Sequence, residues 1–126
     1  MNVVVAIDSF KGSLSSLDAG MAVAEGIKRA NPDAKVAVRP IADGGEGTVD
    51  ALCMALGGII MSIDVNGPLG EKVKAEYGLV VQSRTAIIEI SAAAGITLVP
   101  DDKKNPLNTT TYGVGEIISD AIGRGC

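Results

Sequence analysis

The sequence predicts an α/β protein, and two observations lead to that class. Hydrophobic residues make up 47% of the 126 residues, but aromatic residues make up only 2%. A core must therefore be built from Val, Ile, Leu and Ala, which favours a layered α/β domain over an all-β sandwich. Strand-like and helix-like segments also alternate over residues 1–58, and shorter segments typical of antiparallel strands follow. We expect a βαβα start with an inserted mixed or antiparallel β segment.

The first strand and helix are predicted within residues 1–30. Residues 3–7 (VVVAI) form a continuous apolar run, as in a parallel strand that is covered on both faces. The stretch SSLD at 15–18 resembles a capping box with an acid in the first helical turn. Apolar residues then recur at helical spacing, and Asn31-Pro32 ends the helix.

The second strand and helix follow directly. Residues 35–42 (KVAVRPIA) are strand-like, and Pro40 indicates an end or an edge of that strand. The glycine-rich stretch 43–47 opens a helix with apolar positions at helical spacing, which Gly57-Gly58 closes. Connections this short suit right-handed crossovers between parallel strands.

Residues 59–90 are predicted to form an antiparallel meander. A strand at 59–65 leads to the turn cluster NGPLG. In the next strand, apolar residues alternate with residues that are expected to face solvent. The expected solvent-facing residues are Lys72, Lys74, Glu76 and Gly78. The turn QSR then leads to a buried strand at 85–90 (TAIIEI).

The last part of the chain is predicted to hold a polar loop at 100–106 and a helix that starts at the threonines 109–111. The apolar face of this helix consists of Val114, Ile117, Ile118, Ala121 and Ile122. In a βα framework, a further strand normally follows such a helix. Either the helix packs at an end of the domain, or the chain is the N-terminal portion of a longer protein.

Composition excludes several function classes. The formal net charge is −4 and the sequence pI is about 4.7. The sequence therefore does not predict the basic patch that is typical of nucleic-acid-binding proteins. No apolar run approaches the roughly 18 residues of a membrane span, and the N-terminus lacks a signal-peptide pattern. The two cysteines have no metal or redox spacing, which favours a reduced, cytoplasmic protein. Because histidine is absent, carboxylates, lysines, hydroxyls and backbone amides must carry any chemistry.

The first polar cluster is DSFKGS at residues 8–13, where the first strand ends. Ligands of open α/β sheets bind at the carboxyl ends of strands. Lys11 could neutralise a phosphate or carboxylate, and Ser9 and Ser13 could donate hydrogen bonds. Alternatively, a serine of this region only caps the helix and Lys11 is solvated. We expect Phe10, the single phenylalanine, to turn into the core and anchor the loop.

The second cluster is DGGEGT at residues 43–48, where the second strand ends. Its amides could cradle an anion, although it matches neither a P-loop nor G-x-G-x-x-G. The carboxylates of Asp43 and Glu46 would repel a bare phosphate but suit Mg²⁺ or substrate hydroxyls. The alternative is a helix start in which Asp43 is the N-cap and Glu46 its third-position partner.

Glu89 is the third candidate, because it lies in the apolar stretch AIIEI. An unpaired buried carboxylate is costly. Glu89 should therefore point to a cleft or pair with a cation such as Lys11 or Arg39, unless its strand is one-sided and the carboxylate faces water.

Five stretches together resemble the type-1 glycerate kinases, in that family's order and spacing. They are AIDSFKGSLSSLDA, PIADGGEGTVDAL, VNGPLGEKVKAEYG, TAIIEISAAAGI and NPLNTTTYGVGEII. The resemblance covers essentially the whole chain, with Ile7 where many members have proline. Family members are roughly three times as long, and their later glycine-rich, Asp-containing segment is absent from this chain.

The resemblance implies a two-domain transferase that moves a phosphoryl group from ATP to a hydroxyl of D-glycerate with Mg²⁺. It implies that residues 1–58 are the βαβα portion of a Rossmann- or flavodoxin-like domain and that residues 59–126 are the incomplete start of a second, mixed α/β domain. It implies that both glycine-containing loops line the cleft. Lys11 and Asp43 would be catalytic, and Asp43 and Glu46 would hold the metal. The substrate- and nucleotide-binding residues would be Ser9, Ser13, Gly44, Gly45, Glu46, Gly47, Thr48 and Glu89. Neither nucleic acid nor membrane is an expected partner.

Three questions stay open at this level. The product could be 2- or 3-phosphoglycerate, and Lys11 could contact either substrate. The rival interpretation is a non-catalytic module that binds a small anion or another ligand. A surface left open where a missing part should pack would cause self-association.

Overall fold

The computed structural model describes residues 1–10 and 13–126. The chain divides into two compact units, Met1–Ala51 and Leu52–Cys126, and each is described by itself. This division falls inside helix α2 (Thr48–Leu56), whereas the boundary proposed from the sequence follows that helix. Among the described residues, no helix is long and apolar enough to cross a membrane.

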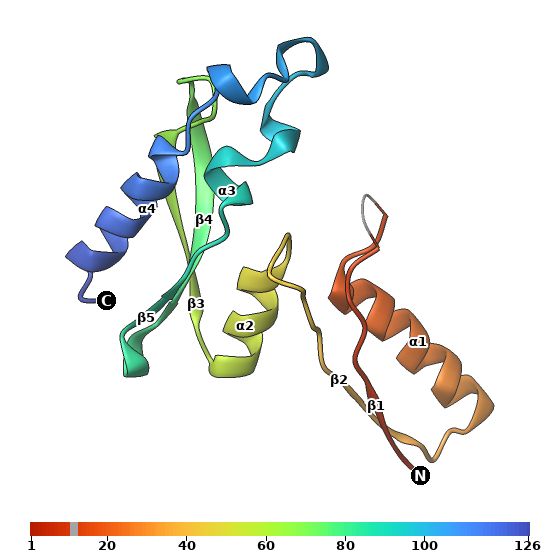
Figure 1. Cartoon of the computed structure of the whole chain (residues 1–126). Coiled ribbons are helices and arrows are strands. Elements are labelled where there is room, and N and C mark those ends of the chain that lie inside the picture. The colour runs from red at the N-terminus through yellow and green to blue at the C-terminus, as the bar shows by residue number, and fades with distance from the viewer. Residues whose placement is uncertain (11–12) are drawn as a thin grey trace. The chain divides into compact units, whose positions relative to one another are not determined.

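The first unit is a parallel strand pair with one helix packed on it (Figure 1). Strands β1 (Asn2–Val5) and β2 (Lys35–Val38) pair in parallel, as predicted, and helix α1 (Ser16–Ala30) connects them. Ser15 is the N-cap of α1, because its Oγ accepts a hydrogen bond from the Asp18 N–H at 3.1 Å. The predicted start and end of this helix are therefore confirmed.

Coverage of the first strand differs from the prediction. Val5 and its partner Val38 face α1, where Gly20 lies against the Val38 side chain. Val4 is one residue out of phase with them and is 69% exposed. The expectation that this strand is covered on both faces is wrong for the described residues, since α1 covers a single face.

The expected role of Phe10 is also wrong. Its side chain is 56% exposed and does not enter the core. Its backbone N–H instead donates to the Leu14 carbonyl at 2.9 Å. Main-chain pairing, rather than aromatic burial, therefore ties Phe10 to the residues before α1.

The second unit contains the predicted antiparallel meander. Strands β3 (Ile59–Asn66), β4 (Lys72–Val80) and β5 (Thr85–Ile87) lie in the order β3-β4-β5. Helices α3 (Ser91–Ala94) and α4 (Tyr112–Gly123) pack against this sheet (Figure 1). Single 3₁₀ turns occur at Val81–Ser83, Ile96–Leu98, Asp101–Lys103 and Pro106–Asn108.

The core of the second unit centres on Tyr77 and Ile117, which are both fully buried. The Tyr77 hydroxyl donates to Asp120 Oδ2 at 2.6 Å, and Arg124 Nε donates to the same oxygen at 2.7 Å. Burial, with the hydrogen bond to Asp120, raises the pKa of Tyr77 to about 12. The bonds to Arg124 and Tyr77 lower the pKa of Asp120. A polar connection from β4 to α4 thus crosses the edge of the core.

Three details of the second unit correct the predictions. Gly78 is buried rather than wet, because the Cys53 side chain of α2 lies over it and a Cβ there would overlap the sulfur. Ile118 and Ile122 are 46% and 63% exposed, so the buried face of α4 is narrower than predicted. The strand predicted over 85–90 ends at Ile87, since the chain turns into α3.

Candidate functional site

The candidate site lies in the first unit, at the carboxyl ends of β1 and β2. Parallel pairing continues to the strand ends, where the Arg39 N–H donates to the Val5 carbonyl at 2.8 Å. The segments after the two strands, which carry DSFKGS and DGGEGT, therefore leave from the same edge of the strand pair. This is the edge at which open α/β sheets bind ligands.

Ser16 joins both segments to the start of α1. Its hydroxyl donates to the Ile7 carbonyl and accepts from the Ile41 N–H at 3.1 Å. One side chain thus holds the chain after β1 and the chain after β2. The sequence pattern predicts at most a capping role for a serine of this region, and Ser15 fills that role. No signal in the sequence distinguishes the bridging role of Ser16 from a helix cap.

The first loop is anchored by its own carboxylate. Asp8 Oδ1 accepts a hydrogen bond from the Ser9 N–H at 2.7 Å. Ser9 is half-buried and Ser13 is exposed. Lys11, the predicted catalytic cation, and Gly12 lie outside the described residues.

The second loop is a tight glycine-rich turn. Asp43 Oδ1 accepts from the Gly45 N–H at 3.0 Å, and Thr48 Oγ1 donates to the Gly45 carbonyl at 2.7 Å. Gly44 and Gly47 have φ angles of 98° and 89°, which L side chains rarely adopt. The glycines therefore shape the loop between two hydrogen-bonded ends.

The alternative role of this loop as a simple capping box is wrong. Helix α2 begins at Thr48, so Asp43 lies too far upstream to be its N-cap, and Glu46 is not its third residue. Asp43 closes the turn before the helix instead. Both carboxylates are exposed and accessible to a ligand.

The chemistry of these carboxylates fits Mg²⁺ in company with a phosphate-bearing substrate. No group of three or more Asp, Glu or Cys side chains that could hold a metal occurs in the described part of the chain. Mg²⁺, however, is usually bound by one or two carboxylates, substrate phosphates and water. Asp43 and Glu46 would then be the protein's ligands.

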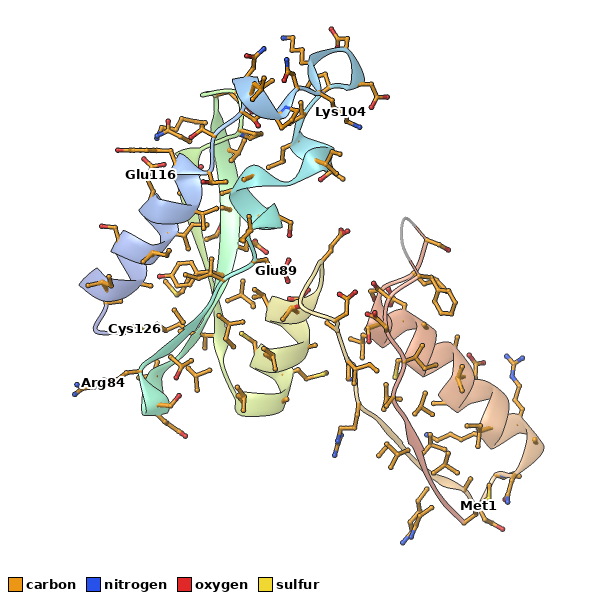
Figure 2. The ribbon with its side chains drawn as sticks, viewed as in Figure 1. Met1, Arg84, Glu89, Lys104, Glu116 and Cys126 are labelled. Carbon is orange, nitrogen blue, oxygen red and sulfur yellow. The ribbon has the colours of Figure 1, made fainter. Side chains whose placement is uncertain are left out.

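Glu89 belongs to the second unit. It follows the end of β5 and precedes α3, where Figure 2 labels it. The carboxylate is half-buried and its Oε2 accepts from Ser91 Oγ at 3.3 Å, while its carbonyl accepts from the Ala92 N–H at 3.2 Å. These bonds fix Glu89 at the start of a short helix, outside a buried strand.

Taken together, the edge of the first unit presents hydroxyls, backbone amides and two carboxylates. Such groups can orient a polyol hydroxyl and share a cation with a phosphate chain. A site of this kind, with neither histidine nor cysteine, suits transfer reactions in which positioning and charge dominate.

Comparison with known proteins gives consistent matches over the whole chain. The sequence profile described as "Glycerate kinase family" matches residues 3–126. The chain is 50% identical to a glycerate kinase of Bacillus subtilis and 46% identical to the glycerate 2-kinase of Escherichia coli, with 99% of the chain and 33% of each relative covered. A crystal structure assigned as glycerate kinase 2 from Salmonella typhimurium LT2 superposes with a TM-score of 0.83 at 46% identity, covering 99% of this chain and 33% of that one. The chain therefore spans about a third of the length of the relatives that it matches.

Proposed function

Because the chain belongs to the glycerate kinase family, we propose that the protein containing it transfers a phosphoryl group from ATP to a hydroxyl of D-glycerate. The observation that carries this proposal beyond family membership is the Ser16 hydroxyl bridge. It joins the two loops that carry the family motifs at one edge of the strand pair.

Different residues of this edge would supply positive charge and orient the substrates. Phosphoryl transfer needs positive charge on the moving group and a carboxylate near the attacking hydroxyl. Lys11 would supply the charge, and Asp43 would orient the acceptor hydroxyl. Ser9 and Ser13 of the first loop would bind substrate, as would Glu46 and Thr48 of the second loop, which Gly44, Gly45 and Gly47 shape. Glu89 also stays a proposed binding residue.

Mg²⁺ would be held by Asp43 and Glu46 together with the phosphates of ATP. When bound, the ion would neutralise charge on the phosphates. For the acceptor, the name of the Escherichia coli relative, glycerate 2-kinase, supports the 2-hydroxyl and hence 2-phosphoglycerate as product. We expect a cytoplasmic protein without nucleic-acid or membrane partners.

The experiment that tests the role of the first loop is Lys11→Ala in the intact protein. Loss of the cation should lower kcat/KM for ATP-dependent glycerate phosphorylation at least tenfold, which is about 1.4 kcal/mol of transition-state stabilisation. Lys28→Ala, on the exposed last turn of α1, is the control and should leave kcat/KM unchanged. An unchanged value for Lys11→Ala would remove Lys11 from the site.

The 126-residue chain should not turn over by itself, because the relatives hold about two thirds of their residues outside the matched region. An assay with ATP and D-glycerate would show this, and clear turnover would contradict it. The rival proposal is a non-catalytic module that binds a small anion or another ligand. It predicts saturable glycerate or phosphate binding without ATP consumption by the intact protein.

A further inference from the structure

We propose that Asn66 is a modification site, at which the side-chain amide is lost by deamidation, and that helix α4 keeps this site closed in the folded protein. The inference is independent of the proposed function, because it concerns the integrity of the second unit and involves no substrate. Asn66 ends β3 and Gly67 begins the turn to β4. Asn66 is the only asparagine of the sequence that precedes a glycine.

Deamidation of an Asn-Gly pair needs no enzyme. The backbone nitrogen of the glycine loses its proton and attacks Cγ of the asparagine. A new C–N bond closes a succinimide ring, and the side-chain amide leaves as ammonia. Water then opens the ring at either carbonyl, which gives aspartate or isoaspartate. Glycine in the second position favours the reaction, because it has no Cβ that hinders ring closure.

The fold requires glycine at position 67. Gly67 is buried, and a Cβ on it would lie 2.7 Å from Cγ1 of Val73 on β4. A larger residue, which would slow deamidation, would therefore overlap the next strand. The labile pair follows from the packing of the turn, so protection must come from other groups of the second unit.

Glu116 of α4, which Figure 2 labels, holds both nitrogen atoms of Asn66. Its Oε2 accepts from the Asn66 N–H at 2.6 Å, and its Oε1 accepts from Asn66 Nδ2 at 2.9 Å. Lys72 Nζ lies 3.6 Å from the same Oε1. Ring closure requires Cγ of Asn66 to swing towards the nitrogen of Gly67. The hydrogen bond from Nδ2 must therefore break before the reaction can start.

The attacking nitrogen is held as well. The Gly67 N–H donates to the Glu71 carbonyl at 2.6 Å, and this bond opposes the loss of the proton that precedes attack. The Asn66 carbonyl lies against Gly113 in the first turn of α4, where a Cβ would overlap its oxygen. Gly113 and Glu116 are three residues apart and share one face of the helix. This face of α4 therefore fixes both the side chain of Asn66 and the peptide bond that follows it.

The product of deamidation would reverse the contact with α4. Aspartate at position 66 would place a carboxylate oxygen where Nδ2 now donates to Glu116. Two carboxylates so close together disfavour each other's charged form, and isoaspartate would also lengthen the main chain at the end of β3. Deamidation should therefore weaken the packing of α4 on β3 (Figure 1).

The first test compares deamidation rates of the intact protein at mildly alkaline pH. Peptide mass spectrometry follows the conversion of residue 66, and labelling by an isoaspartate methyltransferase detects isoaspartate. We expect the folded wild type to deamidate at least tenfold more slowly than the same protein unfolded in guanidinium chloride. Glu116→Gln keeps the size of the side chain but offers one acceptor oxygen in place of two. It should accelerate deamidation of the folded protein at least fivefold.

Tyr77→Phe is the matched control for Glu116→Gln. It removes another hydrogen bond between the sheet and α4 but leaves the contacts of Asn66 in place, so its deamidation rate should equal that of wild type. Equal acceleration by the two variants would overturn the role of Glu116. The comparison of folded and unfolded wild type tests the protection even if Glu116→Gln destabilises the fold, and equal rates there would overturn it.

The second test concerns the product. Asn66→Asp reproduces the aspartate form and should lower the urea midpoint of unfolding. Asn108→Asp adds the same charge at an exposed asparagine of the same unit and should leave the midpoint unchanged. Combining Asn66→Asp with Glu116→Gln should recover part of the loss, because one of the two carboxylates is removed. Equal midpoints for Asn66→Asp and Asn108→Asp would show that deamidation does not weaken the contact with α4.

Discussion

At the scale of single residues, Ser16 holds together the two segments that carry the proposed substrate-binding groups. Sequence patterns predict roles for Asp43, Glu46 and Ser9 because carboxylates and hydroxyls at strand ends have a recognisable chemistry. They could not locate Ser16, whose role depends on which carbonyl and which N–H the fold brings to it. A helix-start serine looks the same in sequence whether it caps a helix or joins two loops.

Ser16→Ala should therefore lower kcat/KM more than its stability cost explains. It leaves the Ile7 carbonyl and the Ile41 N–H without the hydroxyl that joins them, so both loops become less well positioned. Steady-state kinetics and urea denaturation of the intact protein measure the two effects.

Ser15→Ala is the matched control for Ser16→Ala. It removes the N-cap of α1 and should cost about 1 kcal/mol of stability with little change in kcat/KM. If both variants lose stability and activity in the same proportion, Ser16 has no positioning role.

Asp43→Asn separates the structural and chemical roles of the second loop. The amide oxygen can still accept the Gly45 N–H, so the turn and the stability should be kept. Loss of the negative charge should lower kcat/KM at least tenfold, about 1.4 kcal/mol, and raise the Mg²⁺ concentration needed for half-maximal activity. Asp50→Asn, an exposed acid in the first turn of α2, should change neither value; a wild-type kcat/KM for Asp43→Asn would contradict the assignment.

At the scale of elements, sequence periodicity predicted most of what the structure contains. The helix over residues 16–30, the meander β3-β4-β5 and the turns between them follow from local pattern, because turn residues and helix caps act over a few residues. Coverage of the elements was harder to predict. Val4 is exposed although burial was expected, and Gly78 is buried although exposure was expected. Burial depends on which helix packs on which face of the strands, and no local pattern contains that information.

The polar connection between β4 and α4 gives the second unit an alkaline limit. The pKa of Tyr77 is raised to about 12 from about 10 for an unperturbed tyrosine. The protonated phenol is thus favoured in the folded state, and its contribution is complete below pH 10 and lost as pH rises towards 12. Urea denaturation at pH 8 to 12 should show a steeper loss of stability for wild type than for Tyr77→Phe.

The contribution of Asp120 to stability depends on pH in the opposite direction. Because the pKa of Asp120 is lowered in the folded state, its contribution is present at neutral pH. It is lost as pH falls through the folded-state pKa, below the usual range of aspartate.

Identical alkaline stability profiles for wild type and Tyr77→Phe would show that the hydroxyl bond contributes nothing.

At the scale of the whole molecule, the described part of the chain leaves apolar surface exposed to solvent. In the first unit, Val4 is 69% exposed on β1, a strand that pairs with β2 alone among the described residues. Exposed apolar strand edges promote association. The composition and the apolar runs predicted an α/β core but not how much of it the 126 residues can close.

The 126-residue chain should therefore self-associate in sedimentation velocity as its concentration rises. Val4→Lys places a charge on the exposed face of β1 and should shift the chain towards monomer. Leu107→Lys, at a 91% exposed side chain of the second unit, should not. A wild-type chain that stays monomeric at all concentrations would show that the exposed face of β1 does not drive association.

We propose that the two loops at the ends of β1 and β2 serve glycerate phosphorylation. The most direct measurement is formation of phosphoglycerate by the intact protein from ATP and D-glycerate, followed by phosphorus NMR. The proposal predicts a phosphoglycerate signal, assigned to the 2-position, that requires both substrates and is reduced at least tenfold in Lys11→Ala and Asp43→Asn. The absence of glycerate-dependent ATP consumption by the intact protein would contradict it.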